Sequence, residues 1–356
     1  MLLQLPGATL VLALVVQVLA FSLSDVPMWR ARFDEVAIAA LKDPTRYRIL
    51  LFGDSITQIA TGRFSLGAPG EVGNLSTHAG VGLPGSLFLL QRYLSVHPSP
   101  EHVVLSFAPA TYNLPGSVRV ARYNLWLSYT QPNERDFLRT YFPGIERRDW
   151  LPAILDLQER LVEPFFSFLA QRSRSPRMDI GTLTANPDAP VEMAPRVETV
   201  EDEAIFKPLL DVTMSAGNAE ALTRMCNLAN KYGFRIEVAW PPSPAQLESK
   251  LTSSGALTEL EAKISSIMEG HCDFAGFTDF NKIRTYPNLS FRNDLIHLFS
   301  YGWEQRYTAD LREYLSGLRP PVPANATARG PRDQPEAAGA SASRAKGAHG
   351  DDPVEP

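Results

Sequence analysis

The chain has 356 residues, of which 44% are hydrophobic and 21% charged, so it is long and apolar enough to bury a sizeable globular core. Its formal net charge of −5 argues against nucleic acid as a main partner, because phosphate binding needs a basic face. No Walker-type loop or G-x-G-x-x-G turn follows a predicted strand, so the sequence predicts no nucleotide cofactor.

An apolar leader occupies residues 1–24, which carry no charged side chain. Its apolar stretch runs from about Ala8 to Leu23 and is a little shorter than the roughly 20 residues that a membrane span needs. The small residues Val18 and Ala20 suit a signal-peptidase site, although no Lys or Arg precedes the stretch. We expect a signal peptide or an N-terminal membrane anchor, and an exported, periplasmic or otherwise extracytoplasmic protein. A buried N-terminal helix is the alternative.

The first predicted strand covers residues 47–53, in "YRILLFGDS", and ends in a small polar triplet, Gly53-Asp54-Ser55. A serine at the carboxyl end of a parallel strand lies where open α/β sheets place reactive groups. The alternative is a polar turn that only ends the strand. Asp54 is better explained as a residue that holds this turn than as a catalytic acid.

A regular alternation follows, with a short strand in "GEVGNLST", a helix in "LPGSLFLLQRYLSVH" and a third strand in "EHVVLSFAP". Residues 115–210 interrupt it, because they are rich in aromatic residues and mixed charge and, after Ser173, in proline and acidic residues. We expect an insertion that is partly helical and partly loop.

The alternation then returns. A helix in "AGNAEALTRMCNLANKYG" is closed by Gly233, and a fourth strand lies in "FRIEVAWPP". One further helix, "LTSSGALTELEAKISSIMEG", is closed by Gly270, and a fifth strand and a last helix lie in "CDFAGFTDF" and "YGWEQRYTADLREYLSGL". This order predicts an α/β fold, a three-layer α/β/α sandwich around a five-stranded, mainly parallel sheet. The proline-rich tail, 320–356, has no aromatic residue and is expected to be disordered.

Two cysteines, Cys226 and Cys272, permit one disulfide in an exported chain. Two small buried thiols are an equally good interpretation. The stretch "GHCDF" offers one His and one Cys, which are too few for a zinc site, so we expect no metal.

A second group of polar residues stands in "FRNDLIHLFSYGW", just before the last helix. A serine nucleophile needs a base, and the base needs an acid that orients it. Of the six histidines, only His78 and His297 are expected on the same edge of the sheet as Ser55. Only His297 has an acid, Asp294, three residues before it. The alternative is a histidine that only packs at the entry of the helix.

Together, Gly53-Asp54-Ser55 after the first strand and Asp294-x-x-His297 before the last helix resemble the GDSL-type, or SGNH, hydrolase superfamily. The resemblance covers roughly residues 45–110 and 217–317, and it assigns 45–317 to an SGNH-hydrolase-like, flavodoxin-like domain with the insertion 115–210. More narrowly, the chain is similar to the envelope-associated branch that serves O-acetylation of bacterial exopolysaccharides such as alginate and D-alanylation of teichoic acids. The apolar leader, the insertion and the "HLFSYG" continuation carry that similarity.

The resemblance implies a role for each matched residue. Ser55 would be the nucleophile, His297 the general base and Asp294 its orienting acid. The oxyanion hole would use the backbone N–H groups of Ser55 and Gly80, with Gly82 as the next match to the glycine. Its third donor would be the Asn113 side chain. The family's Gly-x-Asn-Asp block is replaced here by "SFAPATYN", so His78 or Thr111 are alternatives to Asn113.

The implied function is Ser-His-Asp acyl-ester chemistry on an envelope or secreted polysaccharide, by O-acyl (acetyl) transfer. We expect the aromatic residues of the insertion to hold the acceptor; they are Trp126, Tyr129, Tyr141 and Trp150. One alternative is a GDSL-type carbohydrate or lipid esterase. Another is a non-catalytic SGNH-like scaffold that binds a glycan or a membrane-bound acyltransferase.

Overall fold

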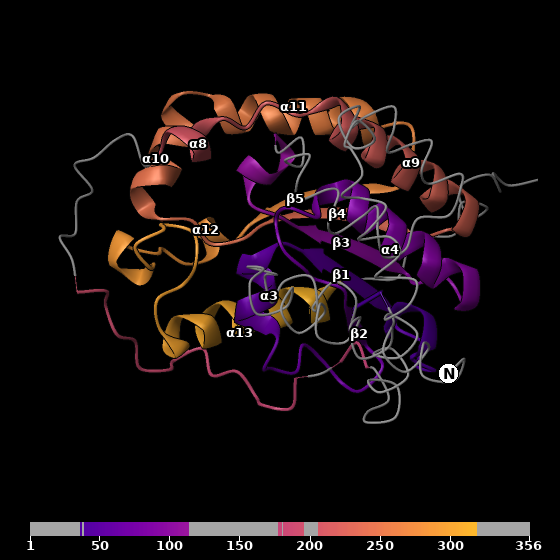
Figure 1. Ribbon diagram of the computed structural model, residues 1–356, viewed down its shortest axis with the longest axis horizontal. Helices are drawn as coiled ribbons and strands as arrows, with labels where there is room; N and C mark the ends of the chain where they lie inside the picture. Colours follow the sequence, from indigo (N-terminus) through magenta and orange to yellow (C-terminus); the bar gives the residue numbers. More distant parts are fainter. Residues whose placement is uncertain (1–35, 38, 114–176, 180, 196–205, 319–356) are drawn as a thin grey trace, which may run out of the picture. The chain divides into compact units, whose positions relative to one another are not determined.

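The computed structural model describes residues 36–37, 39–113, 177–179, 181–195 and 206–318 (Figure 1). Within them, five strands form one sheet in the order β2-β1-β3-β4-β5, and every neighbouring pair is parallel. The predicted five-stranded sheet is confirmed, and it is parallel throughout. The strands are β1 (Ile49–Gly53), β2 (Val72–Asn74), β3 (His102–Ser106), β4 (Arg235–Trp240) and β5 (Phe274–Asp279).

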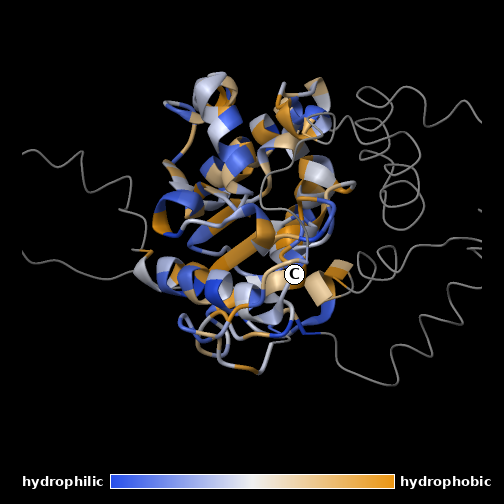
Figure 2. Cartoon of the chain, turned by 90° about the vertical axis from the view of Figure 1, so that its left-hand side faces the viewer, coloured by the Kyte–Doolittle hydropathy of each residue, from blue (hydrophilic) through white to orange (hydrophobic). Residues whose placement is uncertain are grey.

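Both faces of the sheet are buried along its central strands β1 and β3, as their continuous apolar runs require, whereas the edge strand β5 is mostly half-exposed. Side chains alternate along β1, so that Leu50 and Phe52 join one core cluster whereas Ile49 and Leu51 join the other. Figure 2 shows the same arrangement, with hydrophobic strands enclosed by helices of mixed polarity.

Helices on the two faces complete three layers (Figure 1). The first core cluster includes residues of α4 (Gly82–Val96), α9 (Ala216–Tyr232) and α11 (Ala256–Met268). The second includes residues of α3 (Ser55–Thr61) and α13 (Tyr301–Gly317). The three-layer α/β/α sandwich is therefore confirmed. The remaining elements are η1 (Pro109–Tyr112), α8 (Lys207–Leu210), α10 (Ala245–Ser253), α12 (Phe280–Ile283) and η4 (Asn288–Ser290).

One predicted helix is wrong. The stretch "LTSSGALTELEAKISSIMEG" is divided between α10, which ends at Ser253, and α11, which begins at Ala256. Gly255 between them has a φ of 74°, a left-handed conformation that cannot continue a right-handed helix. By contrast, Gly233 closes α9 with a φ of 75°, as the sequence predicts.

A disulfide joins Cys226 in α9 to Cys272, which lies just before β5. The sequence alone left this pairing open. The bond closes a loop of 46 residues and ties a helix of one outer layer to the start of an edge strand.

All described residues belong to one compact unit of the chain. The predicted leader (1–24), most of the insertion (115–210) and the tail (320–356) lie outside the described residues, so these boundaries stay predictions. In the part of the insertion that is described, the backbone runs beside the edge of the sheet, where the Met178 carbonyl accepts a hydrogen bond from the N–H of Asn74 in β2. Among the described helices, none combines the length and the apolar character that a membrane crossing needs.

Candidate active site

Ser55 lies at the point where the strand order reverses. It lies two residues after the end of β1, as the first residue of α3, and β1 has β2 on one side and β3 on the other. In open parallel sheets, the crevice beyond the carboxyl ends of the strands at such a reversal is the usual ligand site. The topology therefore places Ser55 where this fold offers room for a substrate.

The turn that presents Ser55 is held by Asp54. One carboxylate oxygen, Oδ1, accepts the N–H of Ile56 (3.0 Å) and so caps α3. The other, Oδ2, accepts the N–H of Ala108 (2.7 Å) and the hydroxyl of Thr111 (3.1 Å), which joins this turn to the chain after β3. Burial raises the pKa of Asp54, and these hydrogen bonds act in the opposite direction. The predicted structural role of Asp54 is confirmed.

Gly53 permits close packing beneath the turn. A Cβ atom at this position would lie 2.7 Å from both the Ser106 carbonyl oxygen and the Thr57 Cβ atom, so a larger residue would force the turn away from β3. The Thr57 hydroxyl in turn lies 2.9 Å from Ser106 Oγ and 3.3 Å from the Tyr307 hydroxyl. These three buried hydroxyl groups connect α3, β3 and α13 under Ser55.

The three residues predicted to act together are in contact. Ser55 Oγ lies 2.8 Å from His297 Nε2, and His297 Nδ1 lies 2.7 Å from Asp294 Oδ2. The expectation that Ser55 and His297 lie on the same edge of the sheet, within about 4 Å of each other, is confirmed. The same aspartate also accepts the N–H groups of Ile296 (2.9 Å) and His297 (3.0 Å) through Oδ1, so backbone and ring are held by one carboxylate.

The charge of Asp294 determines which nitrogen of the His297 ring carries the proton. Burial acts to raise the pKa of Asp294, but hydrogen bonds from the His297 ring and from the two backbone N–H groups prevail and lower it to about 2. The carboxylate is therefore ionised at neutral pH and accepts a hydrogen bond from the Nδ1–H group of His297. This leaves the lone pair of Nε2 directed at the Ser55 hydroxyl, the arrangement that a general base requires.

The loop that carries Asp294 and His297 is narrow and closed by its own backbone. Phe291 and Leu298 form an antiparallel bridge, and the N–H of Arg292 donates to the His297 carbonyl (2.8 Å). The carbonyl of Ser290 accepts the N–H of Phe299 (2.7 Å). These bonds fix the spacing of the two triad residues on the loop.

Two of the groups considered for the oxyanion hole, the Gly80 N–H and the Thr111 hydroxyl, have other partners in this conformation. The N–H of Gly80 donates to His78 Nδ1 (3.1 Å), and the Thr111 hydroxyl donates to Asp54. Asn113 follows η1, and its N–H donates to the Ala110 carbonyl (3.2 Å). A substrate oxygen would therefore compete with His78 for the Gly80 N–H. The roles of Ser55 N–H, Gly80 and Asn113 in an oxyanion hole stay predictions.

Sequence reasoning missed the supports of this site. Asn218, near the start of α9, donates from Nδ2 to the carbonyls of Thr111 (3.2 Å) and Tyr112 (2.7 Å) and so holds the chain after β3. No local pattern marks an asparagine in a helix as such a support. Trp240, at the end of β4, is buried in the core, and its indole N–H donates to Glu261 (2.8 Å).

Among the described residues, no group of three or more His, Cys, Asp or Glu side chains is placed to hold a metal ion.

No family model matches the sequence, and no curated protein matches it. Among solved structures, the chain is similar to one described as "a putative platelet activating factor from Streptococcus pneumonia", with 12% sequence identity and a TM-score of 0.38. The match covers 85% of this chain and 99% of that one. A likeness at this level carries no information on activity, and the fold assignment rests on the sheet itself.

Proposed function

We propose that this protein is a serine-dependent enzyme of acyl-ester chemistry, with Ser55 as nucleophile, His297 as general base and Asp294 as the acid that orients the base. The hydrogen-bonded series from Asp294 through His297 to Ser55 carries this proposal, because its order and its distances are those that activate a serine hydroxyl. The position of Ser55 at the reversal of strand order supports it independently.

The reaction proceeds in two halves. In the first, His297 Nε2 takes the proton of Ser55 Oγ while Oγ attacks the ester carbonyl carbon, and the resulting imidazolium is stabilised by the Asp294 carboxylate. The same proton then passes to the departing alkoxide, leaving an acyl group on Ser55. In the second half, an incoming hydroxyl gives its proton to Nε2 as its oxygen attacks the acyl carbon; the bond from that carbon to Ser55 Oγ then breaks, and Nε2 returns the proton to Oγ, which restores the Ser55 hydroxyl. The N–H groups of Ser55 and Gly80 and the side chain of Asn113 are the proposed donors to the oxyanion.

For the second half, we propose that the incoming hydroxyl belongs to an envelope or secreted polysaccharide, so that the reaction is O-acyl transfer. The resemblance to the envelope-associated SGNH-like proteins supports this choice, and so does the apolar leader, which supports export. A bound hydroxyl outcompetes water because effective molarities of well-placed groups reach about 10⁵ M or more. Hydrolysis by an esterase is the alternative, since it differs only in the attacking molecule.

The test follows acetate and acetylated sugar together. The protein is given para-nitrophenyl acetate with and without polysaccharide, and Ser55→Ala is compared with Ser266→Ala, a serine-to-alanine change on an exposed turn of α11. Ester cleavage is expected in the wild type and in Ser266→Ala and is expected to vanish in Ser55→Ala. Acetylated polysaccharide identifies transfer, whereas equal acetate release with and without polysaccharide and no acetylated sugar identifies an esterase. If Ser55→Ala keeps full activity, the proposal of a Ser55 nucleophile is wrong; if the wild type itself cleaves no ester, the non-catalytic scaffold alternative stands.

A further inference from the structure

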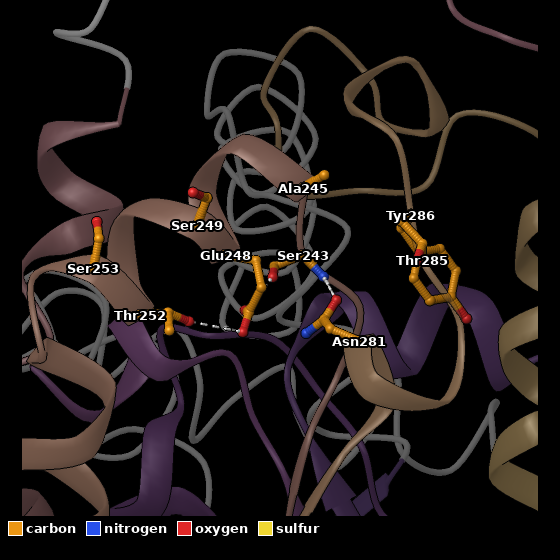
Figure 3. A pocket seen from close by; sticks show the side chains of 9 residues that line it. All are labelled: Ser243, Ala245, Glu248, Ser249, Thr252, Ser253, Asn281, Thr285 and Tyr286. Atoms are coloured by element: carbon orange, nitrogen blue, oxygen red, sulfur yellow. Dashed lines mark hydrogen bonds between the residues drawn. The ribbon is translucent and has the colours of Figure 1, made fainter.

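A cavity of about 450 Å³ opens at the carboxyl edge of the sheet, beyond the ends of β4 and β5 (Figure 3). Ser55 lies at the same edge, because all five strands are parallel. Neighbouring strands lie about 4.8 Å apart, so the ends of β1 and β4, with β3 between them, are separated by roughly 10 Å. The volume falls in the range of small-molecule sites.

The cavity is lined by groups that hydrogen-bond. Of its nine lining residues, five are serines or threonines, one carries an amide and one a carboxyl group, whereas the hydroxyl of Tyr286 is buried away from the cavity. The carboxyl group is that of Glu248, which accepts hydrogen bonds from Ser243 Oγ (3.1 Å) and Thr252 Oγ1 (3.5 Å). Figure 3 shows Ser243 and Thr252 on either side of this carboxyl group, with Asn281 beside Ser243.

Two asparagines hold the walls of the cavity in place. Asn281 accepts the N–H of Ser243 through Oδ1 (2.9 Å), and Asn288 accepts the N–H of Gln246 through Oδ1 (3.1 Å). The Asn288 side-chain amide also donates to the side chain of Gln246 (3.0 Å). Because these bonds join the chain after β4 to the chain after β5, the cavity is formed before any ligand arrives.

The cavity and the triad share one segment of chain. Thr285 and Tyr286 line the cavity, and the same segment continues through η4 into the loop that carries Asp294 and His297. The backbone N–H of Ala245, on the opposite wall, donates to the Tyr286 carbonyl (3.0 Å). A group bound in the cavity would therefore lie against the segment that presents the catalytic base.

The carboxyl groups at the cavity disfavour anionic ligands and favour ligands that donate hydrogen bonds. Burial and the negative charge of Asp279 raise the pKa of Glu248, and the hydrogen bond from Ser243 acts in the opposite direction. An anionic ligand would add a further negative charge beside these two carboxyl groups. A ligand that donates hydrogen bonds stabilises the Glu248 carboxylate, and hydroxyl groups both donate to it and accept from the surrounding hydroxyl side chains.

We propose that this cavity binds one uncharged polyhydroxyl unit, a sugar residue, of the molecule that reacts at Ser55. The link to the reacting group rests on the proposed function, whereas the binding itself can be measured without it. The proposal places a specificity site beyond the carboxyl ends of β4 and β5, in addition to the acceptor site expected in the insertion.

Binding is tested on Ser55→Ala protein, so that it is measured separately from any reaction at Ser55. Maltotetraose, cellotetraose, chitotetraose and mannotetraose are titrated by calorimetry, and Glu248→Gln is then introduced and compared with Glu313→Gln, an exposed glutamate of α13. We expect at least one sugar to bind, and Glu248→Gln to weaken it about 10- to 100-fold, the usual effect of a hydrogen bond to a charged group. Glu313→Gln is expected to leave affinity unchanged, and Thr285→Val serves as a second cavity variant.

The outcomes separate this inference from the proposed function. If no sugar binds with a dissociation constant below about 10 mM, or if Glu248→Gln and Thr285→Val bind it as well as the parent, the cavity proposal is overturned. Binding of tetramethylammonium in place of the sugars also overturns it and marks a cation site. If a sugar binds through Glu248 but Ser55→Ala retains esterase activity, the cavity proposal stands and the enzyme proposal fails.

Discussion

A single leucine holds the triad loop in an unusual shape. Leu295 lies between Asp294 and His297 and has a φ of 55°, the left-handed region that a non-glycine residue enters at a cost of about 1 kcal/mol or more. Its side chain is 1% exposed and belongs to the core cluster that includes α4 and α9. Burial of a leucine side chain is worth about 2 kcal/mol, so packing offsets the backbone strain and fixes the loop.

We therefore expect Leu295→Ala to disturb catalysis as well as stability. The variant keeps the strained backbone but loses the side chain that offsets it, so stability falls by about 2–5 kcal/mol. At a temperature where the variant is still folded, kcat for an activated ester falls while KM changes little, because the base is displaced and the binding surface is not. Leu295→Met, which conserves volume, restores both. A variant with lowered melting temperature and wild-type kcat would show that Leu295 only stabilises the fold.

Asp294 is the residue whose charge orients the base. Its side chain is 42% exposed, so water replaces part of its effect when it is changed. For Asp294→Asn we expect kcat to fall about 10²- to 10³-fold, less than the roughly 10⁴-fold loss seen where the orienting aspartate is buried. Asp188→Asn, a change on an exposed loop, is the control and is expected to keep full activity. Equal activity of the two variants would exclude an orienting role.

The pH dependence of stability follows from the same aspartate. Its pKa in the folded protein, about 2, is below 3.8, the ordinary pKa of an aspartic acid side chain. A lowered pKa contributes stability that is fully present above the unfolded value and is lost as the pH falls through the folded one. Wild type should therefore lose more stability than Asp294→Asn between about pH 5 and pH 2 in thermal melts. Parallel pH profiles of the two proteins would contradict this assignment.

At the scale of elements, the disulfide constrains a helix and a strand beyond what core packing alone does. It joins Cys226, in the C-terminal half of α9, to Cys272, two residues before β5 begins. Both cysteines lie away from the carboxyl edge of the sheet, which carries Ser55. Closing a loop of 46 residues stabilises a fold by about 4 kcal/mol in the chain-entropy model, and measured values are commonly 2–4 kcal/mol.

The paired change Cys226→Ser with Cys272→Ser is thus expected to lower stability by about 2–4 kcal/mol. Esterase activity measured well below the melting temperature should remain, because the bond does not touch the triad. Chemical denaturation gives the first quantity and a steady-state assay the second. Loss of activity in the still-folded variant would mean that the bond also shapes the site.

Beyond the carboxyl ends of β4 and β5, the negative charge of Glu248 opposes folding. Because the pKa of Glu248 is raised in the folded protein, the stability linked to it is present below the unfolded pKa and is lost as the pH rises through the folded value. Glu248→Gln should therefore melt at a higher temperature than wild type at pH 7 and at a similar temperature near pH 4. Equal melting temperatures of Glu248→Gln and wild type at both pH values would show that the Glu248 charge does not destabilise the folded protein.

At the scale of the whole molecule, apolar runs and spaced motifs were enough to predict much of the architecture. Strand runs such as "ILLFG" and the helix closed by Gly233 are local signals, because the burial of both sheet faces and the need for a left-handed residue act within a few positions. The contact between Ser55 and His297 was also predictable, since parallel strands bring their carboxyl ends to one edge.

Other features depend on contacts between distant residues and leave no local pattern. Gly255 is compatible with a helix that continues and with one that breaks, and only the packing of α10 and α11 decides. Asn218 and Asn288 hold the site and the cavity through side-chain amides whose partners are more than 40 positions away in the chain. The hydroxyl group of Tyr307 under Ser55 is a third case.

The long separation between nucleophile and base has a consequence for the time course of folding. Ser55 and His297 are 242 positions apart, and at 5–20 residues per second a ribosome needs roughly 10 to 50 seconds to make the intervening chain. Ser55 stays an ordinary, unreactive hydroxyl during that time, and it is activated only when the segment before α13 docks. Reaction with a fluorophosphonate probe therefore reports the last docking step: in refolding from denaturant, labelling of Ser55 should lag behind the recovery of helical circular dichroism. Labelling that rises together with the helical signal would instead show that the whole sandwich, triad included, forms in one cooperative step.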